Sequence, residues 1–406
     1  MADDGRVTDR IRSLATEAEP WMRGRRRHYH AHPEVSGEEL RTADAVEADL
    51  RSLGLDVTRP LPHAIVATVR GTTGDAYDTT GEPRRRLLMR ADIDALPVTE
   101  ETGLPFSSEN PGVMHACGHD CHIATLLGVA RVLLGMTDEL HGEARLVFEP
   151  AEETGTGAAG LVDAGVLEGV DGAYAEHVWN EVEPGTVSVE AGPRMAAVDW
   201  WRADVYGESA HGAMPEAGAD AIVAAAAAVG ALQDVVARET SPFEPVVVTT
   251  GRIEGGTARN LICDHAWLEG TCRCFSPTTR DELPTLMRRA VEGAASEVGC
   301  TARVEWLAGG HGPVVNDEVA SAMAERSARA MLGDEAISRY AGTMAGEDFS
   351  NVLERVGGLL AFVGSGTADP TGRIWPQHSS HYSPDESILL RGCLLASRYA
   401  VDFLAG

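Results

Sequence analysis

Four short segments of the chain are rich in side chains that bind divalent metal ions or transfer protons. They supply imidazole, thiol and carboxylate groups, the ligands that zinc, manganese or cobalt take in proteins. Their combination points to a hydrolytic metal centre. The segments are Met114–His122 (MHACGHDCH), Phe148–Glu153 (FEPAEE), Ala175–Val178 (AEHV) and His378–Tyr382 (HSSHY).

Each segment alone also has an ordinary structural explanation. A single histidine after a strand is more often hydrogen-bonded within the fold than bound to a metal. Adjacent acids such as Glu152 and Glu153 are usually solvated. The position of the segments favours chemistry instead, because three of them are expected at successive strand ends, where they can converge on one edge of a sheet. Of two neighbouring glutamates there, one can bind a metal while the other faces a water.

An alternation of strands and helices is expected to position these segments. Two helices are predicted within residues 7–53, and the segments that follow alternate between strand and helix. This alternation indicates an α/β domain, with a doubly wound, mostly parallel sheet covered by helices on both faces. The predicted strands are 86–90, 144–148 and 172–175, and the predicted helices are 123–134 and 157–167.

From about Val187 the pattern changes to that of a small α+β sandwich. Strands are predicted at 187–189, 200–206, 246–253 and 266–275, with helices at 220–238 and 281–298. The first pattern then resumes. We therefore expect residues 1–186 and 306–406 to form a discontinuous catalytic domain that carries an inserted α+β domain at 187–305.

Composition excludes several classes of function. The chain has 62 acidic residues against 34 basic ones and a formal charge of −28, so phosphate backbones and anionic lipid are repelled. We expect no nucleic-acid or membrane partner. The sequence has no lysine, which excludes Schiff-base chemistry and a P-loop lysine. Seven irregularly spaced cysteines and an N-terminal stretch without an apolar core favour the reducing cytoplasm.

The motifs extend into a resemblance that covers nearly the whole chain. The sequence resembles the aminoacylase and carboxypeptidase superfamily of dimetal amidohydrolases, in the branch of hippurate hydrolases, N-acyl-amino-acid amidohydrolases and plant auxin-conjugate hydrolases. The resemblance implies hydrolysis of the amide bond of an N-acyl amino acid or similar small amide by a metal-activated water. The matching segments are RRRHYHAHPEVSGEE, LLMRADIDALPVTEETGLPF, VMHACGHDCHIA, FEPAEETGTGAAGLVDAGVL, GESAHGAMPEAGADAI, GGTARNLICDHAWLEGTCR, TMAGEDFS and HSSHYSPDE.

The resemblance also implies two divalent ions per subunit, of manganese, zinc, cobalt or nickel. It makes Glu152 the general base. It makes Asp94 the acidic residue that supports a metal-site group without itself binding the metal. The family's C-terminal ligand precedes an aromatic residue by four positions, as His378 precedes Tyr382, so His378 is preferred to His381. The implied metal ligands are Cys117 as a bridging thiolate, His119, His177, Glu153 and His378.

In this family the inserted domain is a satellite domain that forms a homodimer. His211 matches a histidine that reaches the partner subunit's active site and stabilises the developing oxyanion. Asn260 and Arg273 match positions that hold the substrate's carbonyl or carboxylate. The structural alternatives are a turn cap for His211 and an ion pair on a strand surface for Arg273.

Departures from the family pattern leave the substrate open. Asn180, Glu216 and Cys263 stand where proline, histidine and proline are usual, and the C-terminal motif reads HSSHYSPDE. Tryptophans are candidates for an acyl pocket, although tryptophan is more often part of the core. These tryptophans are Trp179, Trp200, Trp201 and Trp375.

Three other functions remain as alternatives. The first is a dipeptidase or carboxypeptidase of the same superfamily, which differs only in its substrate. The second is a noncatalytic metal-binding protein, against which the intact Glu152 argues, because binding alone needs no additional carboxylate beside the ions. A metal-dependent phosphatase or nuclease is disfavoured by the acidic composition and by the lack of a phosphate-cradling motif.

Overall fold

The computed structural model describes residues 2–369 and 371–406. These residues form two compact units that interrupt one another along the chain. Unit 1 comprises Met1–Arg194, Val315–Ala341 and Asp348–Gly406, and unit 2 comprises Met195–Val314 and Gly342–Glu347.

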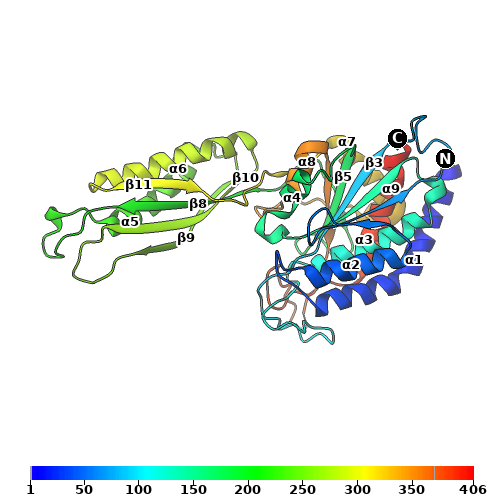
Figure 1. Cartoon of the computed structure of the whole chain (residues 1–406), viewed down its shortest axis with the longest axis horizontal. Helices are drawn as coiled ribbons and strands as arrows, with labels where there is room; N and C mark the ends of the chain where they lie inside the picture. Colours follow the sequence, from blue (N-terminus) through cyan, green and yellow to red (C-terminus); the bar gives the residue numbers. More distant parts are fainter. Residues whose placement is uncertain (1, 370) are drawn as a thin grey trace. The chain divides into compact units, whose positions relative to one another are not determined.

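Unit 1 is built on a seven-stranded sheet whose central part is parallel, which confirms the predicted fold class (Figure 1). The central strands β4, β3, β5 and β13 run parallel to one another, and β1, β2 and β6 add antiparallel edges. In spatial order the strands are β1 (Val57–Thr58), β2 (Ile65–Arg70), β4 (Glu143–Glu149), β3 (Arg86–Asp92), β5 (Gly172–Trp179), β13 (Gly358–Gly364) and β6 (Val187–Ser188).

Helices cover the sheet of unit 1 on both faces. On one face α1, α3 and α9 pack on one another, and on the other α4 packs on α8 (Figure 1). Helix α3 is buried on nearly all its sides, because beyond its first turn its sequence is apolar except for Thr125 and Arg131. The helices are α1 (Ala2–Ala31), α2 (Leu40–Ser52), α3 (His119–Leu134), α4 (Gly157–Asp163), α7 (Glu318–Leu332), α8 (Ser350–Val356) and α9 (Ser387–Ala405), with 3-10 turns at Thr137–Glu139, Glu152–Thr154 and Asp334–Ala336.

Three predicted boundaries in unit 1 are wrong in ways that affect the site. The strand predicted at 172–175 continues to Trp179, so His177 lies within β5 and not after it. All eight residues of β5 are buried and its pairing with β13 runs to Trp179, so sheet hydrogen bonds outweigh the low strand propensity of the polar residues. The helix predicted from Ile123 begins at His119, and the helix predicted to reach Leu167 ends at Asp163.

Unit 2 is an antiparallel four-stranded sheet with two helices that pack on each other. Strand β8 alternates buried and partly exposed residues along its second half, from Trp201 to Tyr206, as expected when one face meets the helices. Asp220 and Ser276 cap the helices by accepting backbone N–H groups. The elements are β8 (Ala197–Tyr206), α5 (Ala221–Asp234), β9 (Val246–Gly255), β10 (His265–Cys274), α6 (Pro277–Glu297) and β11 (Thr301–Trp306), with a 3-10 turn at Pro215–Ala217 and a π-helical turn at Val235–Glu239. The short strands β7 (Gly192–Met195) and β12 (Val314–Asn316) pair with each other, and most of their residues belong to unit 1.

The segment Ala221–Glu239, which is α5 with its π-helical turn, is long and apolar enough to cross a membrane by length and composition. Buried helices of water-soluble domains pass the same test. Here α5 packs on α6 and on strands β9 and β10, and its alanines are buried at Ala221, Ala224, Ala225 and Ala228. The core of unit 2 therefore accounts for one apolar face of the helix, while 33% of the apolar window is buried and Ile222 and Val223 are exposed.

Candidate metal centre

The side chains predicted to bind metal in unit 1 lie close together at the carboxyl ends of the central strands. Metal-binding atoms of Cys117, His119 and His177 lie within 4.8 Å of one another, as do those of Cys117, Glu153 and His378. A third group of the same size joins His119 to both Glu152 and Glu153. Cys117 belongs to two of these groups, one with two histidines and one with Glu153 and His378.

Glycine at position 118 allows the metal-binding loop to approach β5. Gly118 has φ 97°, a left-handed conformation that favours glycine. A Cβ atom added there would overlap the side chain of Val178 and lie 3.0 Å from the hydroxyl of Tyr382. The next residue, His119, begins α3, so Gly118 sets the direction in which Cys117 and His119 leave the loop.

Two further residues of the centre have a backbone conformation that is costly for a residue with a side chain. Among the described residues, Ala151 (φ 59°) and His378 (φ 66°) are the non-glycine residues with positive φ. Such a conformation costs about 1–2 kcal/mol per residue, and it persists only where the surrounding structure imposes it. Its occurrence at these two positions sets the directions of the neighbouring Glu152 and of the His378 imidazole.

Hydrogen bonds fix which nitrogen each buried histidine presents to the centre. His119 Nδ1 lies 2.9 Å from the Asp94 backbone carbonyl and 3.2 Å from its Oδ1. His177 Nδ1 donates to the Val178 carbonyl at 2.8 Å, and its Nε2 lies 3.6 Å from Cys117 Sγ. Both residues therefore present Nε2 to the cluster, as metal-binding histidines do when their other nitrogen is held by a carbonyl or carboxylate.

Unsatisfied atoms in the cluster fit a bound cation. His119 Nε2 and Glu153 Oε1 are buried and have no hydrogen-bond partner. Buried polar atoms without partners are costly, and a divalent ion between them would remove that cost. The donor set of one thiol, imidazoles and a carboxylate is one that zinc, manganese, cobalt and nickel accept.

Asp94 connects three parts of the centre. Its Oδ1 faces His119 Nδ1, and its Oδ2 accepts hydrogen bonds from Ser36 Oγ at 2.6 Å and from the Glu153 backbone N–H at 3.0 Å. The hydrogen bonds and positive charge of this environment overcome the opposing effect of burial and lower the pKa of Asp94. Asp94 thus orients an imidazole and a glutamate at once.

Asp92 and His122 also lie near His119, but protein partners already occupy their polar atoms. Asp92 Oδ1 accepts from His122 Nδ1 at 2.6 Å and its Oδ2 from Arg90 at 2.7 Å. His122 Nε2 accepts the Val178 N–H at 3.0 Å, and burial lowers the pKa of His122, which favours this neutral form. The pair therefore holds β5 through these hydrogen bonds, and its atoms also form a potential ligand group with His119, within 4.8 Å of one another. Sequence reasoning gave neither residue a role, although both lie in or beside the motifs.

The electrostatics of the cluster favour positive charge. Burial opposes ionisation of His119, but the charges of Asp92 and Asp94 and the hydrogen bond to Asp94 outweigh it and raise the pKa to about 10. Burial and the negative charges of Glu153 and Glu152 raise the pKa of the Cys117 thiol well above its usual value. Both shifts describe a buried, electronegative space, in which a bound cation would instead favour the thiolate.

The two C-terminal histidines contact different partners. His378 Nε2 lies 3.5 Å from Glu153 Oε1, and the His378 N–H donates to the Ala116 carbonyl at 2.8 Å. His381 Nδ1 lies 3.0 Å from the Glu101 carbonyl oxygen, and its ring packs on Trp375. The geometry thus brings His378 to the cluster and directs His381 towards a neighbouring pocket.

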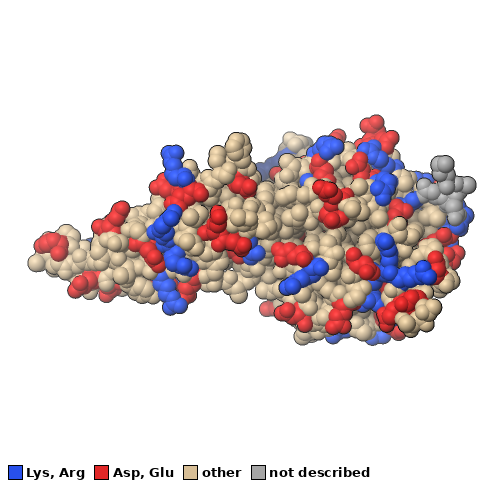
Figure 2. Space-filling view, turned by 90° about the horizontal axis from the view of Figure 1, so that it is seen from above, with Lys and Arg blue, Asp and Glu red and all other residues tan. Residues whose placement is uncertain are grey.

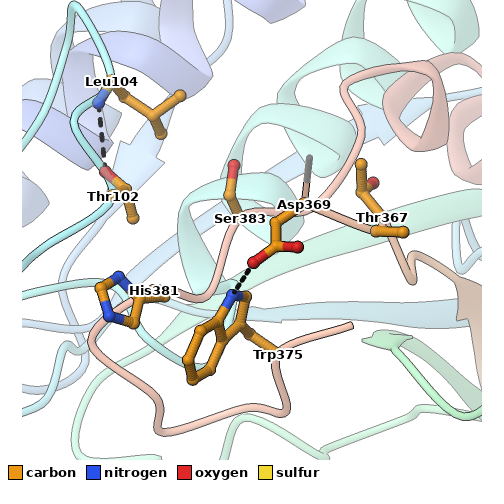
Figure 3. A pocket seen from close by; sticks show the side chains of 8 residues that line it. Thr102, Leu104, Thr367, Asp369, Trp375, His381 and Ser383 are labelled. Atoms are coloured by element: carbon orange, nitrogen blue, oxygen red, sulfur yellow. Dashed lines mark hydrogen bonds between the residues drawn. The ribbon is translucent and has the colours of Figure 1, made fainter. Parts of the chain in front are cut away.

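That pocket has a volume of about 370 Å³ and lies among the loops that carry both histidines (Figure 3). Asp369 orders one wall by accepting the Trp375 indole N–H at 3.0 Å. Its lining residues are Thr102, Leu104, Thr367, Ala368, Asp369, Trp375, His381 and Ser383. Of the other candidate tryptophans, Trp201 is fully buried in the core of unit 2 and Trp179 is buried in unit 1.

The candidate residues of unit 2 fall into two separate places. The Gly212 N–H donates to the Asn260 carbonyl at 2.9 Å, and His211 pairs with Leu261, so His211 and Asn260 lie together. In the chain, both flank the end of the β8–β10 ladder where His265 pairs with Tyr206. Arg273 pairs with Val198 near the opposite end of this ladder, roughly 25–30 Å from His265 along the strand. Its side chain donates to the Met344 carbonyl at 2.8 Å. One copy of unit 2 therefore cannot bring all three residues to one small substrate.

Comparisons with known proteins agree with one another. A model of Peptidase family M20/M25/M40 matches residues 88–401. The chain is 38% identical over 346 residues to the N-acetyl-L-cysteine deacetylase of Bacillus subtilis (strain 168), with 84% of this chain and 80% of the relative covered. It is 34% identical over 406 residues to the thermostable carboxypeptidase 1 of Saccharolobus solfataricus, with 98% and 99% covered. A crystal structure from Bacillus subtilis, described as a dinuclear metal binding peptidase from the M20 family, matches with a TM-score of 0.81 and 31% identity, covering 96% of this chain and 99% of that one.

Proposed function

The chain belongs to Peptidase family M20/M25/M40, as the resemblance predicted, and from that premise we propose that it hydrolyses the amide bond of N-acyl amino acids. The observation that carries the proposal is a buried carboxylate, Glu152, beside the orphaned Nε2 of His119 and Oε1 of Glu153. Ligand atoms without partners fit a metal-dependent enzyme, and an adjacent glutamate supplies a base.

Each side chain then has a defined task. Cys117, His119, His177, Glu153 and His378 would hold two divalent ions, which when bound lower the pKa of a water and polarise the scissile carbonyl. Glu152 accepts the proton of that water and passes it to the leaving nitrogen. Asp94 keeps His119 in the tautomer that presents Nε2.

The substrate class follows from what the relatives share. The B. subtilis relative is named a deacetylase of N-acetyl-L-cysteine and the Saccharolobus relative a carboxypeptidase. Both names describe cleavage of an amide whose nitrogen belongs to an amino acid. An N-acyl amino acid is our first candidate, and a short peptide cleaved at its C-terminal residue is the second, supported by the carboxypeptidase relative.

The decisive experiment is a metal-controlled hydrolysis assay. Metal-free protein is reconstituted separately with manganese, zinc, cobalt or nickel and tested on N-acetyl and N-benzoyl amino acids and on dipeptides. We expect metal-dependent hydrolysis of N-acyl amino acids that a chelator abolishes. Faster hydrolysis of dipeptides would select the second candidate, and no hydrolysis with any metal would contradict both.

The Glu152→Gln variant tests the assigned base. Turnover should fall by about 10²–10⁴-fold, while metal analysis still finds the wild-type number of ions per chain. Glu168→Gln, which removes an exposed carboxylate, is the matched control and should leave both quantities unchanged. Near-normal turnover by Glu152→Gln would remove the residue from this role.

We further propose that the protein acts as a cytoplasmic homodimer formed through unit 2. The separation of His211 and Asn260 from Arg273 within one copy supports a dimer, because sites that use all three residues would need two copies. His211 would stabilise the oxyanion in the partner's site, and Asn260 and Arg273 would hold the substrate.

A further inference from the structure

Glu39 lies outside the metal centre but contacts the turn that carries the base. It directly precedes α2 and is fully buried. Its Oε1 accepts the backbone N–H of Gly37 at 2.9 Å and that of Ala151 at 2.8 Å. Its Oε2 lies 3.0 Å from His63 Nδ1. A carboxylate buried this deeply is costly unless all its partners are present.

The Ala151 N–H belongs to the left-handed residue that immediately precedes Glu152. Hydrogen bonds and one close backbone contact constrain the rest of the turn. The Ala151 carbonyl accepts N–H groups of Thr156 and Gly157, both at 3.3 Å, and a Cβ added to Gly157 would overlap the Pro150 carbonyl. The turn therefore depends on a conformation that alanine rarely adopts.

Two buried carboxylates hold this turn from its two ends. Glu39 accepts the Ala151 N–H at 2.8 Å, and Asp94 accepts the Glu153 N–H at 3.0 Å. Glu152 is the residue between these two anchored amides. The direction of the Glu152 side chain therefore depends on a backbone segment that is hydrogen-bonded to a carboxylate on each side.

We propose that Glu39 is a positioning residue that holds Ala151 in its left-handed conformation and thereby directs the Glu152 carboxylate into the metal centre. The proposal rests on the proposed function of Glu152 as the base. It concerns backbone geometry, so it can be tested both with and without catalysis.

The kinetic test compares substitutions that keep or remove the acceptor. In Glu39→Gln the amide oxygen can still accept both N–H groups, so kcat should remain within a few-fold of wild type. In Glu39→Met, which has a similar volume and no acceptor, kcat should fall by about 10²-fold, the usual effect of misplacing a catalytic group by about 1 Å. KM should change by less than about threefold, and metal content should be retained.

Two controls separate this role from a general loss of structure. Glu38→Met changes the exposed neighbour of Glu39 and should have no effect on kcat. If Glu39→Met does not fold, Glu39→Asp decides, because it keeps the charge and withdraws the acceptor by one methylene. A kcat within twofold of wild type in a folded Glu39→Met or in Glu39→Asp would overturn the proposal, as would equal losses in Glu39→Gln and Glu39→Met.

Hydrogen exchange provides a readout that needs no substrate. In metal-free protein, amides of the segment 149–157 should exchange at least tenfold faster in Glu39→Met than in wild type or Glu39→Gln, while amides of α3 are unchanged. Unchanged exchange at 149–157 would overturn the proposal. If exchange changes as expected but the wild type hydrolyses no N-acyl amino acid or peptide, the proposed function fails and the positioning of the turn stands.

Discussion

At the scale of single residues, the site is defined by which atoms already have partners. Asp92 and His122 look like ligands by type and proximity, yet hydrogen bonds to Arg90, to the Val178 N–H and to each other occupy them. His119 Nε2, by contrast, is buried without a hydrogen-bond partner. Since burying an unpaired polar atom is costly, the missing partner makes His119 the better candidate for a metal ligand.

Asp94→Asn tests this distinction. Asparagine can still accept the Glu153 N–H, but its neutral side chain is a weaker partner for His119 Nδ1. We expect metal affinity to fall about 10–100-fold, as is typical when the carboxylate behind a ligand histidine is altered. Competition with a chromogenic chelator measures the affinity, and Asp163→Asn, at the exposed end of α4, is the control. An unchanged affinity would mean that His119 is oriented by the Asp94 backbone carbonyl alone.

At the scale of elements, a buried charge network joins α1 to the start of α3. Arg26 and His30 on α1 both contact the Asp120 carboxylate, at 2.9 and 3.0 Å, and His30 Nε2 lies 3.2 Å from Glu100. Asp120 directly follows His119, so this network holds the helix turn that carries a predicted ligand. A buried network of this kind is destabilising when one partner is lost.

The network predicts a pH dependence of stability. Burial opposes protonation of His30, but Asp120 and the hydrogen bonds to Asp120 and Glu100 outweigh it and raise the pKa to about 9 from 6.5. The stabilisation is therefore complete below about pH 6.5 and is lost as pH rises through 9, by on the order of 3 kcal/mol. The free energy of unfolding, measured by chemical denaturation, should differ less between wild type and His30→Gln at pH 9.5 than at pH 6. His32→Gln, at the exposed residue just beyond α1, is the control substitution.

The loop between β13 and α9 gives a second prediction at this scale. It carries His378 as well as the pocket residues Trp375 and His381 (Figure 3), and Asn180 at the end of β5 anchors it through the Ser365 hydroxyl at 2.8 Å and the Trp375 carbonyl. If the pocket receives the acyl group, Trp375→Ala should lower kcat/KM for N-benzoyl substrates about tenfold more than for N-acetyl substrates. Equal losses on both substrates would assign Trp375 to loop structure alone. Trp267→Ala, on the sheet of unit 2, is the matched control.

At the scale of the whole molecule, the distribution of surface charge and the exposed apolar side chains bear on how the protein assembles. Acidic and basic side chains are interspersed over the face shown in Figure 2, within a chain of net charge −28. In unit 2, Ile222, Val223, Val247 and Ile253 leave apolar surface exposed on α5 and β9. A homodimer formed through these elements would remove this apolar surface from water.

Mixed dimers test whether His211 acts across such an interface. Glu152→Gln and His211→Ala should each be nearly inactive alone, because one lacks the base and the other the oxyanion donor. In a mixed dimer, one site would combine an intact metal centre with an intact His211. Random exchange of subunits should then restore about a quarter of wild-type activity, following the statistics of random pairing. Light scattering should give a mass of twice 43.0 kDa. No recovery on mixing, in a protein shown to be a dimer that exchanges subunits, would place His211 in its own subunit's site or in none.

The amino-acid sequence by itself determined the fold class and the types of the candidate ligands. Alternating strands and helices predicted the mostly parallel sheet, and motifs such as MHACGHD and PAEE carry their chemistry in contiguous residues. Local patterns suffice for these features because strand and helix periodicity and side-chain chemistry are properties of short segments. The end of β5 was missed, because the pairing with β13 that extends it to Trp179 comes from a segment some 180 residues away.

Only the tertiary structure decided which of these polar atoms have hydrogen-bond partners within the protein. The Asp92–His122, His122–Val178 and Glu39–Ala151 hydrogen bonds join residues 30, 56 and 112 positions apart in the sequence. Likewise, the antiparallel register of β8 and β10 separates Arg273 from His211 and Asn260. Hydrogen-bond satisfaction and distance depend on contacts between remote segments, and no local pattern of residues encodes those contacts.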